Sequence, residues 1–164
     1  MLHGRRPRRL GQAIIEALVS LSALTVGFLG IFALLSQSFS LNRTVSNNYI
    51  ANYLATEGIE VVKNVIDNNT INSRAWDSGL TDGTFEVDYS SLSLSANQNR
   101  LLGFDPTAHL YSYSGSSPTP FRRTVTLTDL SGTQLKVVSQ VNWVDRGGGT
   151  FQVTLEDHFY HWRP

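Results

Sequence analysis

Apolar side chains are concentrated in one long run near the start of the chain. Residues 17–35 read ALVSLSALTVGFLGIFALL and include no formally charged side chain. About twenty residues at 1.5 Å per residue span the roughly 30 Å hydrocarbon core of a bilayer. The run therefore predicts a transmembrane helix over residues 17–35, with a buried core helix of a soluble domain as the less favoured interpretation.

A helical pattern continues beyond this run. Apolar or small side chains recur at three- and four-residue spacings, which predicts one apolar helix face that packs on a second layer. These positions are Val45, Tyr49, Ile50, Tyr53, Leu54, Gly58, Val61, Val62 and Val65. The turn-forming residues 67–70 (DNNT) then predict the end of the helix. We expect one helix over residues 12–66, with a transmembrane half followed by an amphipathic half.

From residue 67 on, the pattern changes to the two-residue alternation of strands. The predicted strands are 84–89, 101–104, 110–113, 121–128, 135–144 and 150–161, with a loop at 114–120. Alternation places Val137, Val141 and Trp143 on one face of their strand, and Phe151, Val153 and Leu155 on one face of the next. Trp143, Phe159 and Trp162 are expected to anchor the last hairpin. The prediction is an α+β fold, in which a β-rich globular head, residues 67–164, packs as an antiparallel sheet on the outer half of the helix.

Charge is distributed unevenly along the 164 residues. Thirteen Lys and Arg balance thirteen Asp and Glu, but four arginines (5, 6, 8 and 9) lie in the first ten residues. Nine bases and thirteen acids remain, so the rest of the chain carries a net charge of −4. A basic start, an apolar run and an acidic body predict a cytoplasmic N-terminus and an exported body. The balance disfavours nucleic-acid binding, and the absence of cysteine excludes disulfides, Cys-ligated metals and a thiol nucleophile.

Three fates are open to the apolar segment: a removed secretory signal, a plain permanent anchor, or an anchor processed on its cytoplasmic side. Ser36-Gln37-Ser38 is a small-x-small site at the end of the run, which would allow cleavage after Ser38. However, the run of nineteen residues exceeds the usual core of about 7–15 residues in a cleaved signal. The helical pattern also crosses the supposed cut.

Glu16 is the one ionisable side chain between Gln12 and Asn42. A carboxylate in a membrane helix costs up to about 3 kcal/mol at the bilayer centre and less near the interface. One interpretation places Glu16 among lipid headgroups or near the positive helix N-terminus. The other is that its charge awaits a cation, which assembly or processing supplies.

The residues around Glu16 resemble a known processing signal. Arg8-Arg9-Leu10-Gly11 followed by QAIIEALV, residues 12–19, resembles the class III signal of type IV pilins and pseudopilins. The resemblance implies that a prepilin peptidase removes a leader, residues 1–11, by cutting between Gly11 and Gln12, and then N-methylates Gln12. It further implies that Glu16 pairs with the freed N-terminal amine of a neighbouring subunit in a filament. It covers about the first sixty residues, which look most like V-type minor pilins and the I-type pseudopilins of type II secretion.

The apolar helix is expected to be less stable at Gly27 and Gly30, because each glycine costs a helix about 1 kcal/mol relative to alanine. The resemblance implies that the helix melts here on filament assembly. Close packing of small residues between helices in lipid is the alternative, with equal support.

The sequence indicates little catalytic or metal chemistry. His158 and His161 lie beside Glu156 and Asp157, but strand positions three apart face opposite sides, so a metal site is disfavoured. Asp77, Asp82, Asp88 and Asp105 match no calcium-loop spacing. Arg122-Arg123 is expected to be a solvated pair rather than a contact to DNA phosphates. No nucleophile motif is present, so we expect no enzyme and no cofactor.

Together these features predict a structural subunit of a type IV pilus or related filament, with a minor pilin favoured over a major one. Expected partners are other pilin subunits, a prepilin peptidase/N-methyltransferase, the pilus assembly platform and the membrane. The expected location is the inner membrane, followed by the extracellular filament. The alternatives are a type II secretion pseudopilin, a secreted binding domain cut after Ser38, and a membrane-anchored hydrolase.

Overall fold

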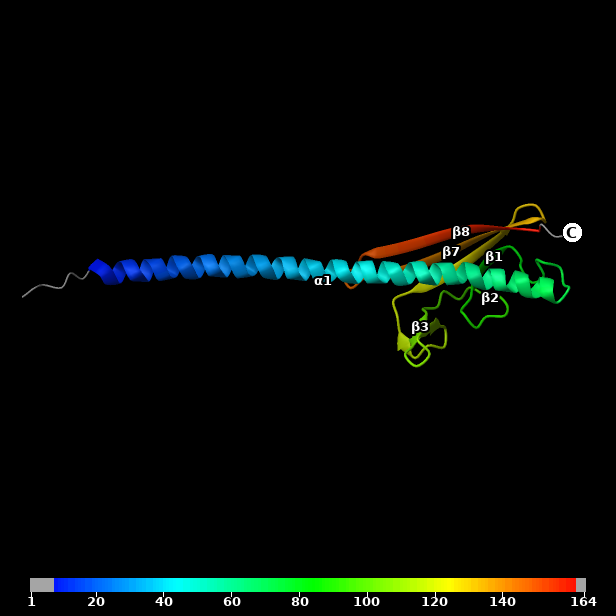
Figure 1. The fold of residues 1–164 in the computed structure, drawn as a ribbon, viewed down its shortest axis with the longest axis horizontal. Helices are drawn as coiled ribbons and strands as arrows, with labels where there is room; N and C mark the ends of the chain where they lie inside the picture. The colour runs from blue at the N-terminus through cyan, green and yellow to red at the C-terminus, as the bar shows by residue number, and fades with distance from the viewer. Residues whose placement is uncertain (1–7, 162–164) are drawn as a thin grey trace, which may run out of the picture. The chain divides into compact units, whose positions relative to one another are not determined.

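One continuous α-helix begins the structure. The computed structural model describes residues 8–161, with side chains from Gly11 on. Helix α1, Arg8–Ile71, has 64 residues (Figure 1). The chain divides into two compact units, residues up to Val45 and residues from Ser46 on. We call the second unit the head; it contains the end of α1 and every described strand.

Helix α1 differs from the prediction at both ends. It begins at Arg8, inside the expected leader 1–11, of which residues 1–7 lie outside the described part. It ends at Ile71, five residues later than expected, because the asparagines bond within the helix: the Asn72 amide donates to the Asn68 carbonyl at 2.8 Å. Ser73, at φ 54°, then terminates the helix in the left-handed conformation.

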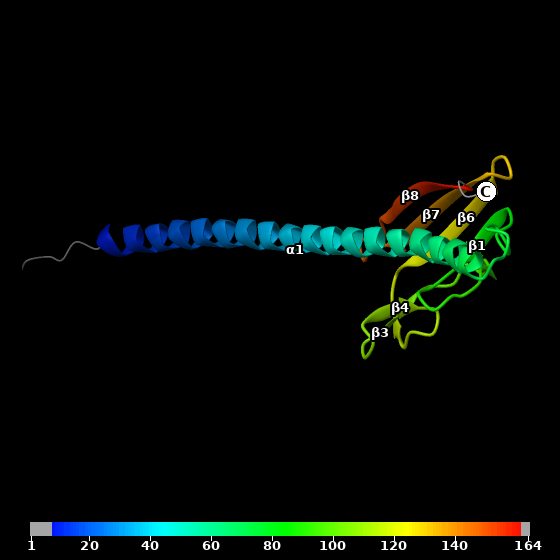
Figure 2. The same ribbon diagram turned by 45° about the vertical axis from the view of Figure 1, so that its right-hand side comes forward.

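The strands form two antiparallel sheets (Figures 1 and 2). Their bounds are β1 Gly83–Glu86, β2 Ser95–Ala96, β3 Gly103–Asp105, β4 Leu110–Ser112, β5 Ser117–Pro118, β6 Arg122–Asp129, β7 Gln134–Val144 and β8 Thr150–Tyr160. The larger sheet has the order β2-β1-β6-β7-β8, and the smaller one β4-β3-β5. The predicted α+β fold, with a long helix packed on an antiparallel sheet, is confirmed.

Each predicted strand is present with small shifts at its ends, whereas β2 and β5 are additional strands of two residues each. Strand β5 falls in the expected loop 114–120, where it pairs with Gly103 and Phe104. In β7 the predicted inner face is confirmed, because Val137, Val141 and Trp143 are all buried. Trp162, expected in the last hairpin, lies outside the described residues.

The buried face of the helix differs in part from the predicted one. Val45, Tyr49 and Tyr53 are 58%, 79% and 64% exposed, so their assignment to the packed face was wrong. The buried stripe in this region is centred instead on Ala51, with Leu54 and Ala55. Positions two residues from Ala51 are turned by about 200° around the helix, which directs both tyrosines away from the sheet.

Two apolar clusters fill the space between α1 and the larger sheet. One contains Val61, Val62, Val65, Leu80, Val87, Val125, Leu127, Leu135 and Val137. The other contains Ala51, Leu54, Ala55, Leu102, Phe121, Val141 and Trp143. Helix α1 and strand β7 contribute residues to both clusters, as does β6 together with Phe121 immediately before it. Along each of these segments, one buried residue lies between the residues of one cluster and those of the other: Gly58 on α1, Arg123 on β6 and Ser139 on β7. We call these three residues the dividing layer.

Gly58 is the point of closest approach in the dividing layer. A Cβ atom at this position would overlap Ser139 Oγ and lie 3.1 Å from Val125 Cγ2 and 3.2 Å from Arg123 Cδ. A Cβ atom here therefore requires Ser139 Oγ or the helix to shift, so the packing favours glycine for space rather than for backbone conformation.

Gly58→Ala is predicted to destabilise the head, although alanine is favoured over glycine in a helix by about 1 kcal/mol. We expect a net loss of about 1–3 kcal/mol from overpacking. Thermal and denaturant unfolding of the full chain in detergent micelles, followed by tryptophan fluorescence, measures it. Adding Ser139→Ala is expected to recover about 0.5 kcal/mol or more of that loss. Equal losses with and without S139A would contradict the steric explanation.

Candidate functional site

The residues of the predicted processing signal lie on one exposed stretch of α1. Gly11, Gln12 and Glu16 are helical and exposed. Gln12 and Glu16 are four residues apart, so they lie on the same side of the helix, about 6 Å apart along its axis. The Glu16 carboxylate has no ion-pair or hydrogen-bond partner within the described residues. The stretch thus presents, one helical turn from the expected new N-terminus, a carboxyl group with no partner among residues 11–161.

Helix α1 is long and apolar enough to cross a membrane. From Gly11 to Ile71 it contains an 18-residue window of mean hydropathy 2.3, none of which is buried within the structure. The hydroxyl groups of Ser22 and Thr25 donate to the carbonyl oxygens of Leu18 and Leu21, at 2.7 and 2.8 Å. These polar side chains are satisfied by the helix itself, so they are tolerated in an apolar environment.

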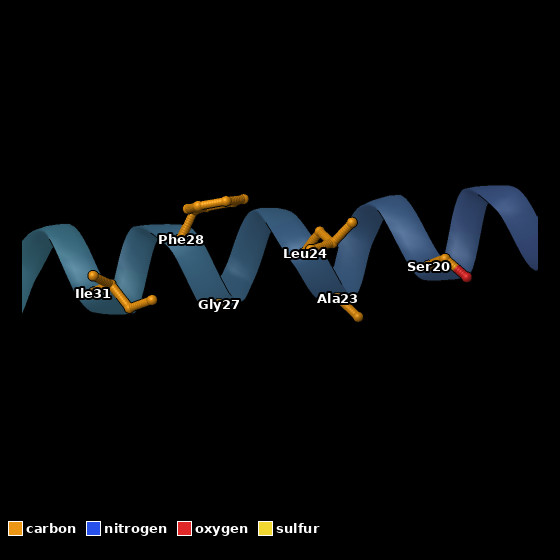
Figure 3. A pocket seen from close by; sticks show the side chains of 6 residues that line it. All are labelled: Ser20, Ala23, Leu24, Gly27, Phe28 and Ile31. Carbon is orange, nitrogen blue, oxygen red and sulfur yellow. The ribbon is translucent and has the colours of Figure 1, made fainter.

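A shallow apolar hollow of about 360 Å³ lies along one side of this segment (Figure 3). It is lined by Ser20, Ala23, Leu24, Gly27, Phe28 and Ile31. A Cβ atom at Gly27 would meet no other atom within 4 Å, which leaves open space beside the backbone. Gly30 is equally open but does not line the hollow, so the structure brings Gly27 but not Gly30 into this surface.

In the head, Arg123 joins three segments. Its Nη1 donates to the Leu54 carbonyl of α1 at 2.9 Å and to Glu57 Oε1 at 3.1 Å. Its Nη2 donates to the carbonyl oxygen of Val87, just after β1. The Arg123 side chain is fully buried, so the expectation of a solvated Arg122-Arg123 pair was wrong for this residue. The two arginines alternate on β6, and only Arg122 lies on the face away from the helix.

The alternation of side chains along β6 could have predicted from sequence that Arg123 lies on the buried face of the sheet. Phe121, Arg123, Val125 and Leu127 are two residues apart and all buried. Because strand side chains alternate, an arginine at this phase must share the buried face with its apolar neighbours. Its acceptors could not be inferred in the same way, since Leu54, Glu57 and Val87 are remote in sequence.

A second buried carboxylate anchors the segment that follows β2. Glu86 accepts hydrogen bonds from the backbone N–H groups of Gln98 and Arg100, and its Oε2 lies 2.8 Å from Arg100 Nε. Burial opposes ionisation of Glu86, but the bonds from Arg100 and Gln98 outweigh it and lower the pKa of this carboxyl. The Arg100 guanidinium also lies over the ring of Tyr113, 4.5 Å from its centroid.

Asp88 and Tyr113 extend this polar region toward the smaller sheet. Asp88 accepts bonds from Ser90, from Ser91 and from the Tyr113 backbone N–H. Burial raises the pKa of Asp88, yet these donors outweigh it and the net shift is downward. Burial also raises the pKa of the Tyr113 hydroxyl to about 12. This hydroxyl donates to the Arg123 carbonyl, so the region forms a connected hydrogen-bond network.

The two histidines considered as metal ligands have different neighbours. His158 contacts Glu156 at 3.0 Å and Gln134 at 2.8 Å. His161 stacks on Trp76, with ring centroids 5.6 Å apart. Among residues 11–161, no group of three or more His, Asp or Glu side chains is arranged to hold a metal ion.

Comparison with known proteins adds no relative: no family model, no curated protein and no solved structure matches the chain. The functional argument therefore depends on the residues and their geometry. The N-terminal stretch of α1 can offer an anion and an apolar surface to other helices, and the head supplies a rigid body stabilised by Arg123 and Glu86.

Arg123→Met is predicted to destabilise the head by about 3 kcal/mol or more, because it removes the counter-charge of Glu57 and the buried hydrogen bonds to the Leu54 and Val87 carbonyl groups. Arg122→Met is the matched control: the same change one residue away, on the other face of β6, is expected to cost no more than about 0.5 kcal/mol. Denaturant unfolding of both variants in micelles measures the difference. Similar losses for the two arginines would contradict the assigned role of Arg123.

The lowered pKa of Glu86 predicts an acid-dependent stability. A carboxyl whose pKa is lower in the folded state than in the unfolded state, where it is near 4.5, stabilises the fold above that pH. The contribution is lost as the pH falls through the lowered, folded-state pKa. Glu86→Gln is expected to reduce stability at pH 7 and to flatten its decline below pH 4.5, as measured by urea unfolding across pH. Glu60→Gln, at an exposed carboxyl on α1, is the control that should keep the decline.

Proposed function

We propose that this chain is a structural subunit of a type IV pilus or related filament, most like a minor pilin. The observation that carries the proposal is Glu16, which has no partner among residues 11–161 and lies on an exposed, apolar α1, five residues after Gly11. A basic N-terminus precedes this segment, and an α+β head follows it on the same chain.

In this proposal the precursor inserts with its leader on the cytoplasmic side, and a prepilin peptidase cuts between Gly11 and Gln12. The cut creates an ammonium group at Gln12, which the same enzyme N-methylates. In a filament, Glu16 of one subunit accepts the N-terminal ammonium of its neighbour, and the attraction is strong because the surroundings are apolar. The energetic cost of a charge in the membrane helix is thereby offset on assembly.

The hollow at Gly27 supports the packing role of this segment. An open space beside Ser20, Ala23 and Gly27 allows the backbone of another helix to approach closely, and van der Waals contact is the main source of helix association in lipid. Melting of the helix at Gly27 and Gly30 on assembly is the second possible role of these residues, and both roles place them at a contact between subunits.

A type II secretion pseudopilin shares all of these features and is the nearest alternative function. The secreted domain cut after Ser38 has less support, because α1 runs through Ser36-Gln37-Ser38 without interruption and continues to Ile71. Cleavage after Ser38 would divide this helix, whereas cleavage after Gly11 leaves nearly all of it intact.

Processing and assembly can be tested separately in a strain that produces the filament. The mature protein is predicted to begin at Gln12, as measured by mass spectrometry of its N-terminal peptide. Glu16→Ala is expected to leave this cleavage intact but to reduce incorporation into sheared filaments by about tenfold or more, since the ion pair in apolar surroundings is lost. Ser22→Ala, on the same apolar segment but outside the hollow, is the matched control. A mature N-terminus at Phe39, or normal incorporation of the E16A variant, would contradict the proposal.

A further inference from the structure

Strand β8 leaves a long free edge on the larger sheet. It ends the strand order, so one of its edges has no strand partner within residues 8–161. It pairs with β7 over its whole length in one register, from Gln134↔Tyr160 to Val144↔Thr150, without a bulge. A long, regular free edge is a template for a further strand.

The hydrogen bonds at the two ends of the β7–β8 ladder show which groups face this edge. The His161 N–H donates to the Thr133 carbonyl, and the Asp145 N–H donates to the Gly149 carbonyl. Bonded and non-bonded pairs alternate in an antiparallel ladder, so the odd-numbered residues of β8 bond to β7. The even-numbered residues, from Thr150 to Tyr160, therefore direct their backbone N–H and C=O groups to the free edge.

The helix-facing side of the sheet is apolar as far as this edge, and its side chains on β8 remain partly exposed to solvent. Phe151, Val153, Leu155 and Phe159 lie on the helix-facing side of β8 but are only partly buried. Their partners across the ladder in β7 are buried. A strand added beside β8 would cover the remaining apolar area.

We propose that this edge pairs with β8 of a second copy of the chain, antiparallel and fully overlapped, and that Asp157 limits this pairing. Full overlap places Leu155 opposite Leu155 of the second copy and matches even-numbered with even-numbered residues, as the outward backbone groups require. The other opposed pairs are Thr150–Tyr160, Phe151–Phe159, Gln152–His158, Val153–Asp157 and Thr154–Glu156.

Charge favours this register. No two like charges oppose each other in it, and Glu156 already has Lys136 at 2.8 Å on its own sheet. A shift by two residues in one direction would place Glu156 against Glu156 of the second copy. A shift by two in the other direction leaves Phe159 and Tyr160 without a partner in β8 of the second copy.

Asp157 acts against the pairing in two ways. Its Oδ1 accepts the backbone N–H of His158 at 2.8 Å, which occupies one of the donors that face the edge. Its carboxylate also lies on the otherwise apolar side of β8, where pairing would bury it opposite Val153 of the second copy. A charge that points toward the core side of an edge strand is a known protection against edge-to-edge association.

The pairing has twofold symmetry and closes after two copies. It therefore joins two heads and differs from any contact that extends a helical filament. It does not depend on the proposed pilin function, since it involves only residues of the head.

Single cysteines provide the test, because the chain contains none. Leu155→Cys places two cysteines opposite each other in a non-bonded pair, whose Cα atoms are about 4.5 Å apart and within disulfide reach. Val153→Cys is the matched control: it is also partly buried on the same face, but the two cysteines would be about 13 Å apart. The full-length chain in detergent micelles is oxidised, and the disulfide-linked dimer is quantified on non-reducing gels with and without Asp157→Thr.

We expect a linked dimer for L155C, at least about tenfold less for V153C, and a higher yield for L155C when D157T is added. Light scattering of D157T without any cysteine checks the result independently, and it should show more dimer than the wild-type chain. Equal yields for L155C and V153C, or a mixed disulfide with another protein in place of the homodimer, would overturn self-pairing. No increase with D157T in either measurement would overturn the role of Asp157.

Discussion

Within the head, a buried guanidinium joins the larger sheet to α1. Arg123 extends from β6 to a backbone carbonyl in the middle of α1 and to another just after β1, with Glu57 as its counter-charge. A charge in the interior is tolerated only when it is paired and hydrogen-bonded, so these acceptors must stay in place for the fold to persist. The contact fixes which turn of the helix lies over the sheet.

The rest of the head core is arranged around that contact. Gly58 leaves room for Ser139 and for the stem of Arg123, and the two apolar clusters fill the space on either side. Apolar packing is non-directional, so by itself it specifies the position of the helix less sharply than the buried polar contacts do. The dividing layer fixes the position of α1 along the sheet, because only Gly58 is small enough to lie against Arg123 and Ser139.

Periodicity predicted the elements of this fold more reliably than it predicted their contacts. The apolar run, the change to alternation after residue 67 and the inner face of β7 follow directly from spacing, since spacing reports which side of an element is buried. The same rule failed at Tyr49 and Tyr53, where the helix buries Ala51 and Ala55 instead. Close approach to a sheet favours small side chains, and a hydrophobicity pattern gives these little weight. The end of α1 was also missed, because asparagines that favour turns can bond within a helix.

The residues of the candidate site also differ in how far the sequence could predict them. The resemblance to the pilin signal pointed to Gly11, Gln12 and Glu16, and the roles of these residues stay predictions; their common place on one helical stretch follows from their local spacing. The network of Arg123, Glu86 and Asp88 depends on residues remote in sequence and became visible only in three dimensions. No local pattern indicates that a particular arginine will bond to a carbonyl 69 residues away.

The dividing layer also determines how the head responds to mechanical load. A force along the axis of α1 drives the helix to slide over the sheet. A slide of one turn brings Leu54 or Val62 to the place of Gly58, where there is no room for a side chain, and breaks the bonds of Arg123 in the same movement. Steric overlap at Gly58 and the hydrogen bonds of Arg123 therefore oppose the same sliding movement together.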